Sequence, residues 1–280
     1  MSASLGRLTQ LAASAYGAPS PACVVTAPGS QILVTIAARL LLPGRAVILG
    51  PTYAEHARAA AIAEHEVSTV SELAPLGDAD LAIVVNPNNP DGRIVSREDL
   101  LAIAERQRAH DGLLIVDEAF MDAGPREESL SAHVDHANIV VLRSFGKFFG
   151  LAGLRLSFAL AAHPVAALVN ATLGPWPVSG AALAIGTAAL GDQRWMDDTR
   201  AALATAAARL DVLIEGTGLE NIGGTDLFRL VRTSDAPRLF ETLGCGGILV
   251  RRFPERPELL RFGLPGPEAD WQRLEAVLRS

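Results

Sequence analysis

The stretch Ile139-Val-Val-Leu-Arg-Ser-Phe-Gly-Lys-Phe-Phe-Gly-Leu-Ala-Gly-Leu-Arg155 joins an apolar run to a segment of polar, aromatic and glycine residues. The run from Ile139 to Leu142 has the length and composition of a fully buried strand. Lys147 follows after a short turn and is flanked by three phenylalanines. A lone lysine is usually a solvated surface residue. Because apolar neighbours disfavour the ammonium form, we expect Lys147 to present a nucleophilic amine instead.

Similar apolar runs recur upstream and alternate with amphipathic segments. Residues 46–49, 81–85 and 113–116 each predict a buried strand, and residues 52–63 and 96–110 predict helices between them. This alternation predicts an α/β fold with a mainly parallel sheet and helices on both faces.

The alternation of short apolar runs with amphipathic segments changes near residue 190. A long helix is predicted over 193–215, then strands over 227–231 and 247–251, and a closing helix over 267–278. We therefore predict a large domain over residues 1–190 and a smaller C-terminal α/β domain over 191–280.

Composition narrows the class of protein. The net charge of −7 argues against a nucleic-acid or anionic-membrane partner. The two cysteines lack metal-ligand spacing, so we predict neither a metal site nor a disulfide framework. The N-terminus lacks the pattern of a signal peptide, and the apolar stretch 165–190 is broken by Asn170, Pro175 and Pro177. We expect a cytoplasmic protein, with 165–190 forming buried helix and turn.

Four polar segments lie where predicted strands end or helices begin, and ligands bind at such places in open α/β sheets. They are Pro28–Gln31, Asn86–Gly92, Asp117–Phe120 and Ser144–Lys147. Asp117 ends an apolar run, so its carboxylate needs a partner. A helix cap or a salt bridge would satisfy it as well as a ligand would.

Gly29, Ser30 and Gln31 open a predicted helix over residues 32–42. Backbone N–H groups at a helix N-terminus, together with the helix dipole, favour an anion such as phosphate. A simple helix cap is the alternative interpretation.

The four segments, in this order, resemble the class I/II aminotransferases, which use pyridoxal 5'-phosphate. The spacing of Ser144, Lys147 and Arg155 is similar to the family's Schiff-base segment. The loop containing Asn89 resembles its asparagine loop, and Asp117-Glu-Ala its cofactor-aspartate strand. The resemblance implies the pyridoxal-phosphate-dependent transferase fold type I, with the cofactor bound in the large domain.

Residue roles follow from this resemblance. It implies that Lys147 carries the cofactor as a Schiff base, that Asp117 pairs with the pyridine nitrogen, and that Asn89 binds the phenolic oxygen. Tyr53 would stack on the ring as a further catalytic-site residue. The phosphate would be bound by residues that can donate hydrogen bonds to it: Gly29, Ser30, Gln31, Ser144 and Arg155. Arg261 would hold the substrate carboxylate.

Two departures from the family pattern affect these expectations. Phe120 stands where many members have a tyrosine that donates to the phenolic oxygen, so we expect the acid–base behaviour of the bound cofactor to differ. Members usually carry some tens of residues before the point matching Leu5, including a segment over the substrate. We therefore expect closure over the substrate to differ too.

Finer resemblance favours one branch of the family. The segments around Lys147, Trp176, Phe228 and Arg251 look like the threonine-phosphate decarboxylases of cobalamin biosynthesis. The implied reaction is decarboxylation of O-phospho-L-threonine to aminopropanol phosphate. Arg251 would bind the substrate phosphate, and Trp176 would line the site. Arg251 could equally be a solvated strand-end residue, and Trp176 a core residue.

Other functions use the same motifs. A histidinol-phosphate type of aminotransferase would need every residue named above, and a non-catalytic protein could retain the fold. A Rossmann dehydrogenase is a weaker alternative because no G-x-G-x-x-G follows the first strand. The histidines form no metal spacing, so we assign them no catalytic role. Family resemblance and the apolar stretch 165–190 predict a homodimer.

Overall fold

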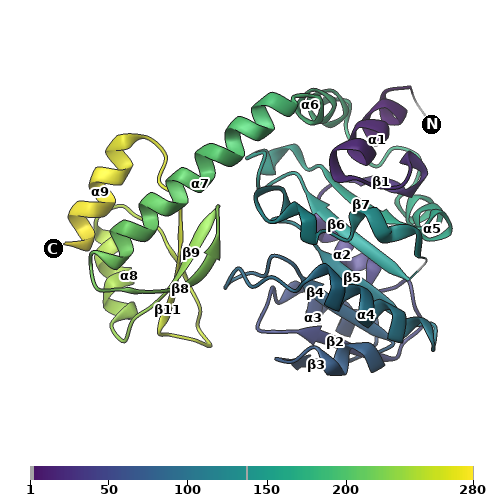
Figure 1. The fold of residues 1–280 in the computed structure, drawn as a ribbon, viewed down its shortest axis with the longest axis horizontal. Helices are drawn as coiled ribbons and strands as arrows, with labels where there is room; N and C mark the ends of the chain where they lie inside the picture. The colour runs from purple at the N-terminus through teal and green to yellow at the C-terminus, as the bar shows by residue number, and fades with distance from the viewer. Residues whose placement is uncertain (1–2, 137, 280) are drawn as a thin grey trace. The chain divides into compact units, whose positions relative to one another are not determined.

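The structure is a computed structural model that describes residues 3–136 and 138–279. The chain forms two compact units. The first comprises the residues up to Asn88 together with Ile94–Gln193, and the second comprises Asn89–Arg93 together with the residues from Arg194 on. Figure 1 shows the order of the elements along the chain.

The first unit is built on a seven-stranded sheet of order β1-β7-β6-β5-β4-β2-β3. Strands β3, β2, β4, β5 and β6 pair in parallel, whereas β7 is antiparallel to both of its neighbours. The strands are β1 (Val24–Ala27), β2 (Arg45–Leu49), β3 (Glu66–Val70), β4 (Leu81–Val85), β5 (Leu113–Asp117), β6 (Ile139–Ser144) and β7 (Ser157–Ala161). The predicted α/β fold with a mainly parallel sheet is confirmed.

Helices cover both faces of this sheet. The described helices are α1 (Ala3–Tyr16), α2 (Ser30–Ala37), α3 (Glu55–Ile62), α4 (Arg97–Arg108), α5 (His163–Leu173) and α6 (Gly180–Gly191). Helices α2, α3 and α5 share one apolar core with Leu113 and Ile115 of β5. Because successive strand residues point to opposite faces, Leu114 and Val116 face the other side, where α4 packs against β5 (Figure 1). Short 3-10 helices lie over Pro21–Cys23, Ala74–Asp78, Met121–Ala123, Arg126–Glu128, Ser131–His136 and Ala152–Leu154.

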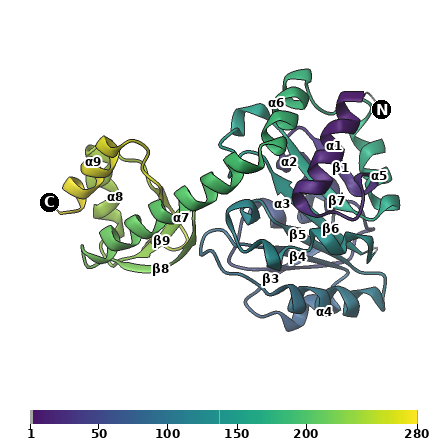
Figure 2. The ribbon, with the colours of Figure 1, turned by 45° about the horizontal axis from the view of Figure 1, so that its top comes forward.

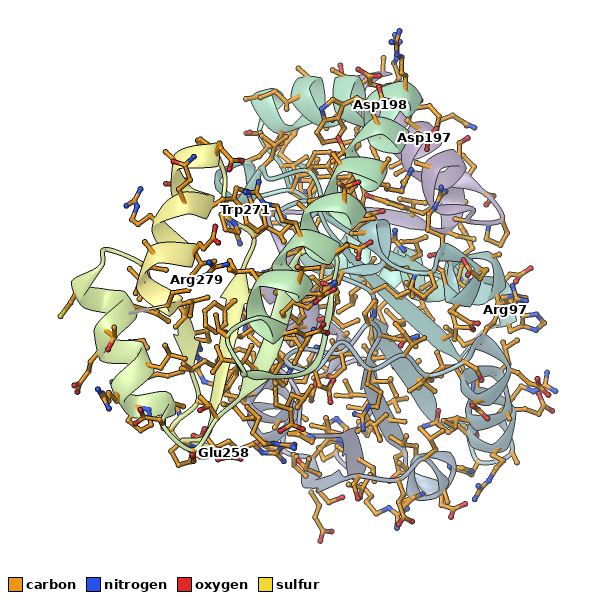
Figure 3. The ribbon with its side chains drawn as sticks, turned by 60° about the vertical axis from the view of Figure 1, so that its left-hand side comes forward. Arg97, Asp197, Asp198, Glu258, Trp271 and Arg279 are labelled. Atoms are coloured by element: carbon orange, nitrogen blue, oxygen red, sulfur yellow. The ribbon has the colours of Figure 1, made fainter. Side chains whose placement is uncertain are left out.

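The second unit is a four-stranded antiparallel sheet of order β10-β11-β9-β8 with helices on one face. Its elements are α7 (Gln193–Glu215, whose first residue belongs to the first unit), β8 (Glu220–Thr225), β9 (Phe228–Arg232), α8 (Ala236–Cys245), β10 (Arg251–Arg252), β11 (Leu259–Gly263) and α9 (Glu268–Leu278). Figure 2 shows α8 beside α9, and the two helices contact each other. Trp271 of α9 is buried toward α7, where the Arg209 guanidinium lies 4.3 Å from its ring centroid (Figure 3).

Three predicted elements differ in the structure. The helix predicted over 32–42 is α2, which ends at Ala37 in turns whose N–H groups bond three residues back. The strand predicted over 247–251 is reduced to Arg251–Arg252, because Gly247 (φ +72°) ends α8 and the Ile248 N–H bonds back to Leu243. The stretch 165–190 is helix, turn and helix as predicted, but it is not buried throughout, since Leu168 is 54% exposed. Within the described residues, no helix combines the length and apolarity needed to cross a bilayer.

A buried ion-pair cluster joins the ends of β5 and β6. Arg143 of β6 donates to Glu118 Oε2 at 2.8 Å and also bonds Asp122. All three side chains are buried, and the Tyr16 ring lies 4.4 Å from the Arg143 guanidinium. Burial alone would lower the pKa of Arg143, but Asp122 and Glu118 outweigh burial and raise that pKa. Arg143 is therefore charged, and it fixes the strand end that leads to Lys147 beside the strand end that leads to Asp117.

We predict that Arg143→Met destabilises the protein by about 3–5 kcal/mol, because two buried carboxylates lose their partner. Arg106→Met is the matched control: its ion pair with Asp78 is largely exposed, so its loss should cost about 0–1 kcal/mol. Urea unfolding followed by circular dichroism measures both. Equal small losses in the two variants would contradict the prediction.

Candidate active site

The first part of the candidate site surrounds Asp117, at the carboxyl end of β5. Asp117 Oδ2 lies 2.8 Å from His56 Nε2, and Oδ1 accepts the Ala119 N–H at 3.0 Å. Both Asp117 and His56 are buried. The predicted need of Asp117 for a partner is thus met within the protein, and two contacts fix the direction of its carboxylate.

Tyr53 extends this cluster toward solvent. Its ring meets the His56 ring edge to face, with centroids 6.0 Å apart, and 41% of the residue is exposed. The Tyr53 hydroxyl donates to Gln31 Oε1 at 3.4 Å, and Gln31 Nε2 donates to Glu55 at 2.9 Å. Burial, Glu55 and Asp117 raise the pKa of Tyr53, so its hydroxyl stays protonated. One aromatic face is therefore held near Asp117 with part of its surface open.

Lys147 is the only lysine in the chain, although lysine and arginine together number 24. It follows β6, and its Nζ lies 5.3 Å from the centroid of the Phe120 ring. The flanking phenylalanines are buried, as expected, but Lys147 itself is exposed. The apolar setting expected for the amine includes the Phe120 ring.

The second feature of the first unit is a set of groups suited to an anion. Gly29 (φ +97°) is the N-terminal cap of α2, so the N–H groups of Ser30 and Gln31 begin that helix. A Cβ at Gly29 would overlap the Arg155 guanidinium, which places this cation directly against the helix start. Ser144 ends β6 and is buried. Backbone donors, a helix N-terminus and a guanidinium form a fitting arrangement for a phosphate group.

The remaining predicted residues lie in the second unit. Arg261 of β11 bonds the Asn89 side-chain oxygen, and its guanidinium lies 4.9 Å from the Phe228 ring centroid. Arg251 of β10 is the register partner of Arg261, so the two arginines stand on the same face of the sheet. Burial and the nearby Arg251 both lower the pKa of Arg261. The two guanidiniums thus form a concentrated positive region that an anion would stabilise.

Trp176 belongs to the first unit. It is 89% exposed and lines a cavity of about 480 Å³ together with Pro28, Ile32 and Leu168. Neither Asp117 nor Lys147 lines that cavity. Its predicted place at the substrate stays a prediction.

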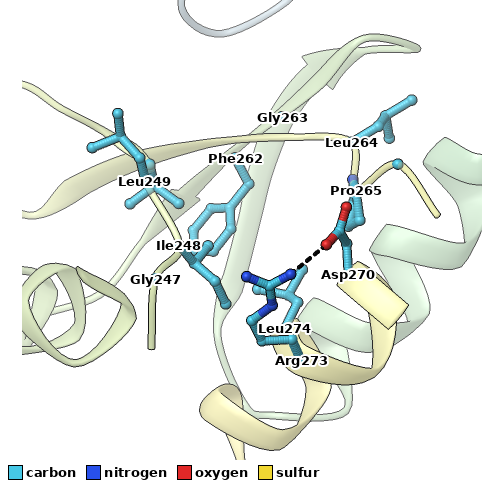
Figure 4. Close-up of a pocket in the computed structure, with 12 residues that line it drawn as sticks. Gly247, Ile248, Leu249, Phe262, Gly263, Leu264, Pro265, Asp270, Arg273 and Leu274 are labelled. Carbon is cyan, nitrogen blue, oxygen red and sulfur yellow. Dashed lines mark hydrogen bonds and ion pairs between the residues drawn. The ribbon is translucent and has the colours of Figure 1, made fainter. Parts of the chain in front are cut away.

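A cavity in the second unit is distinct from the candidate site. It has a volume of about 300 Å³ and is lined by residues such as Ile248, Phe262 and Leu274, with an Asp270–Arg273 ion pair of 2.6 Å on its wall (Figure 4). None of the residues that line it is a predicted site residue. Its apolar lining is part of the core that holds α8 and α9 on the sheet.

His56 is the residue that the sequence interpretation missed. It was given no role because the histidines show no metal spacing, yet it bonds the predicted cofactor aspartate across 61 residues of sequence. One local signal was present: His56 follows Tyr53 by three residues at the start of a helix, so both side chains can reach the same neighbour.

Comparison with known proteins agrees with this geometry. The profile of the family "Aminotransferase class I and II" matches residues 5–277. A threonine-phosphate decarboxylase from Sinorhizobium sp. is 46% identical over 90% of this chain and 75% of its own length. Another, from Pseudomonas aeruginosa, is 41% identical over 96% of this chain and 84% of its own length.

Solved structures share the fold. L-threonine-O-3-phosphate decarboxylase from Porphyromonas gingivalis superposes with a TM-score of 0.83 at 22% identity, covering 98% of this chain and 88% of that one. Histidinol-phosphate aminotransferase from Sinorhizobium meliloti, in complex with pyridoxal-5'-phosphate, gives 0.83 at 23% identity, covering 100% and 83%. With a family profile spanning almost its whole length, this chain belongs to the class I and II aminotransferase family.

Proposed function

We propose that this chain is a pyridoxal 5'-phosphate-dependent lyase that converts O-phospho-L-threonine to aminopropanol phosphate and carbon dioxide for cobalamin biosynthesis. The observation that carries the proposal is the 46% and 41% identity to two threonine-phosphate decarboxylases over nearly the whole chain. The paired arginines of β10 and β11 support it, because a phosphorylated amino acid offers one anionic group to each.

The residues of the first unit fit the cofactor. Arg155 against Gly29, with the N–H groups of Ser30 and Gln31 and the Ser144 hydroxyl, would hold the phosphate. Tyr53 would cover a face of the ring. The family resemblance adds the amide of Asn89, a residue of the second unit, as a donor to the phenolic oxygen. Lys147 supplies the chain's one side-chain amine.

Bound pyridoxal phosphate supplies an electron-poor ring that takes up the electron pair left on the substrate Cα when carbon dioxide departs. The Asp117 carboxylate, fixed by His56 at 2.8 Å, holds a proton on the pyridine nitrogen. Lys147 would hold the cofactor through Nζ, and its amine would supply the proton that replaces the lost carboxylate on the substrate Cα.

Substrate binding falls to the second unit. Arg261 binds the carboxylate and Arg251 the phosphate, each through charge-assisted hydrogen bonds. Neutralising both guanidiniums removes the repulsion that lowers the pKa of Arg261. Threonine without its phosphate leaves Arg251 unpaired and is therefore a poor substrate.

A histidinol-phosphate aminotransferase is the second candidate function. A protein of that name from Symbiobacterium thermophilum is 29% identical over 97% of this chain, and the same residues would serve transamination. The requirement for a 2-oxo acid acceptor separates the two reactions, because only transamination uses one.

The chain is also proposed to act as a cytoplasmic homodimer. Cys23 and Cys245 are both free thiols, as a reducing compartment allows. Large apolar side chains meet solvent on one surface formed by α2, α5 and the loop after α5, which we call the α2–α5 surface: Ile32 (38% exposed), Leu168 (54%) and Trp176 (89%). These three residues line the cavity of about 480 Å³. A second copy of the chain would remove this apolar surface from water.

Lys147 gives the first test. Sodium borohydride added to the protein with pyridoxal phosphate should fix the cofactor to the peptide that contains Lys147, detected by mass spectrometry. Lys147→Arg keeps the positive charge but lacks a nucleophilic amine, so it should take no label and lose turnover by several orders of magnitude. Because the chain has one lysine, only the α-amino group competes for the reagent. Normal turnover in Lys147→Arg would refute the proposal.

The reaction assay tests the substrate. Phosphothreonine should release carbon dioxide without any 2-oxo acid. Arg251→Ala should weaken phosphothreonine binding by about 10- to 150-fold, the equivalent of a lost charge-assisted contact, with a smaller effect on kcat. Arg252→Ala is the matched control, because its guanidinium lies over the Phe240 ring at 5.1 Å on the opposite face of the strand. Product that forms only with an acceptor present would make the protein an aminotransferase.

The α2–α5 surface predicts the oligomeric state. Sedimentation at micromolar concentration should give a dimer, and a Leu168→Glu, Trp176→Ser double variant should give a monomer, because a charge at the interface resists burial. Val212→Glu is the control: Val212 is 72% exposed on α7, outside this surface, and its variant should remain a dimer. A fully active wild-type monomer would overturn the prediction.

A further inference from the structure

The segment Asn89–Arg93 lies in the chain between β4 and α4 but packs with the second unit. Its neighbours stay in the first unit. Asn88 donates to the Pro51 carbonyl at 2.9 Å and accepts the Thr52 hydroxyl at 2.6 Å. Asn86 closes the base of the loop with two hydrogen bonds to the Val95 backbone, of 3.0 and 2.9 Å. The base of the loop is thus held by one unit and its tip by the other.

The packing at the tip is backbone against backbone. A Cβ at Gly92 would overlap the Gly224 carbonyl group, and a Cβ at Gly223 would overlap the Asp91 carbonyl oxygen. All three glycines have positive φ: +73° at Gly92, +145° at Gly223 and +153° at Gly224. Neither the space nor the backbone conformation suits a residue with a side chain. We call Gly92, Gly223 and Gly224 the glycine seat.

The seat is connected to Arg261 through the sheet. Gly223 pairs in register with Leu230 of β9, Leu230 pairs with Arg261 of β11, and Arg261 pairs with Arg251 of β10. These residues form one line across four strands on a single face. The loop meets this line twice, at Gly223 through Asp91 and at Arg261 through the Asn89 side chain. Asp211 of α7 holds the β8–β9 hairpin from the other side through a two-point bond to Arg229, of 2.5 and 2.9 Å.

We infer that the glycine seat is a positioning device that fixes Asn89 beside Arg261, so that the cofactor-directed amide and the carboxylate-binding guanidinium are located by one sheet. The roles of Asn89 and Arg261 in this inference rest on the proposed function, whereas the backbone packing does not. A methyl group added at Gly92 or Gly223 displaces the loop tip and, with it, Asn89. Gly92, Gly223 and Gly224 then act on the reaction without touching the substrate or the cofactor.

The first measurement uses the cofactor-bound protein. The pH midpoint of the cofactor's visible absorbance should rise in Asn89→Ala, because the lost donor no longer stabilises the phenolic oxygen's negative charge. Gly223→Ala, whose Cβ would overlap the Asp91 carbonyl oxygen, should raise the midpoint by at least half of that shift. Gly263→Ala is the matched control: Gly263 ends β11 opposite Phe228, and a Cβ there meets no atom within 4 Å. Its midpoint should equal that of the wild type.

The second measurement needs no cofactor. Hydrogen exchange of the peptide spanning residues 89–93 should accelerate by about tenfold or more in Gly223→Ala and remain unchanged in Gly263→Ala. If Gly223→Ala does not fold, Gly92→Ala, whose Cβ would overlap the Gly224 carbonyl group, takes its place in both experiments. A folded seat variant with wild-type exchange and a wild-type midpoint overturns the inference. If the absorbance midpoint of Asn89→Ala equals that of the wild type, the proposed role of Asn89 is refuted instead. The hydrogen-exchange result then tests the glycine seat by itself.

Discussion

A buried arginine between two carboxylates holds together the two strand ends from which the candidate site is built. Arg143 belongs to β6, which leads to Lys147, and its partner Glu118 directly follows Asp117 at the end of β5. Buried ion pairs often add little net stability relative to apolar packing, because desolvation opposes the Coulomb attraction. The consequence here is geometric. Two short directional bonds fix the separation of the adjacent parallel strands β5, which ends at Asp117, and β6, which leads to Lys147.

Three of the strands that the sequence predicted are buried along their whole length. The apolar runs at 81–85, 113–116 and 139–142 belong to central strands of the sheet, where continuous burial leaves a continuous apolar run. Strand β3 was missed because it is a partly exposed edge strand with the sequence Glu-Val-Ser-Thr-Val. Strand β8 was missed because Asn221, Gly223 and Gly224 give it a bulge and a glycine pair in place of an alternating pattern.

In the candidate site, some residues could be identified from the sequence around them, whereas other features depend on contacts between distant parts of the chain. Asp117 and Lys147 could be identified because Asp117 ends an apolar strand and Lys147 follows one after a short turn, which are local signals. The bond from His56 to Asp117 spans 61 residues, and the bond from Arg261 to Asn89 spans 172, so no periodicity indicates either one. The packing of Asn89–Arg93 with the second unit is equally invisible, because it depends on the absence of side chains on two separate backbones. Gly92 and the Gly223–Gly224 pair become meaningful only as neighbours in space.

Lysine and arginine are both cations, but they differ in chemical reactivity. Arginine stays protonated under all ordinary conditions and cannot serve as a nucleophile, whereas lysine can lose its proton and attack a carbonyl. The chain uses arginine almost everywhere and places its single lysine after β6.

On β10 and β11, two arginines stand opposite each other as register partners and repel, which is unfavourable without a counter-anion. The overall charge of −7 attracts no anion from a distance, so the proposed recognition of an anionic substrate would depend on this local pair. A ligand with a carboxylate at one end and a phosphate at the other relieves the repulsion at both guanidiniums. A ligand with a single anionic group relieves only one.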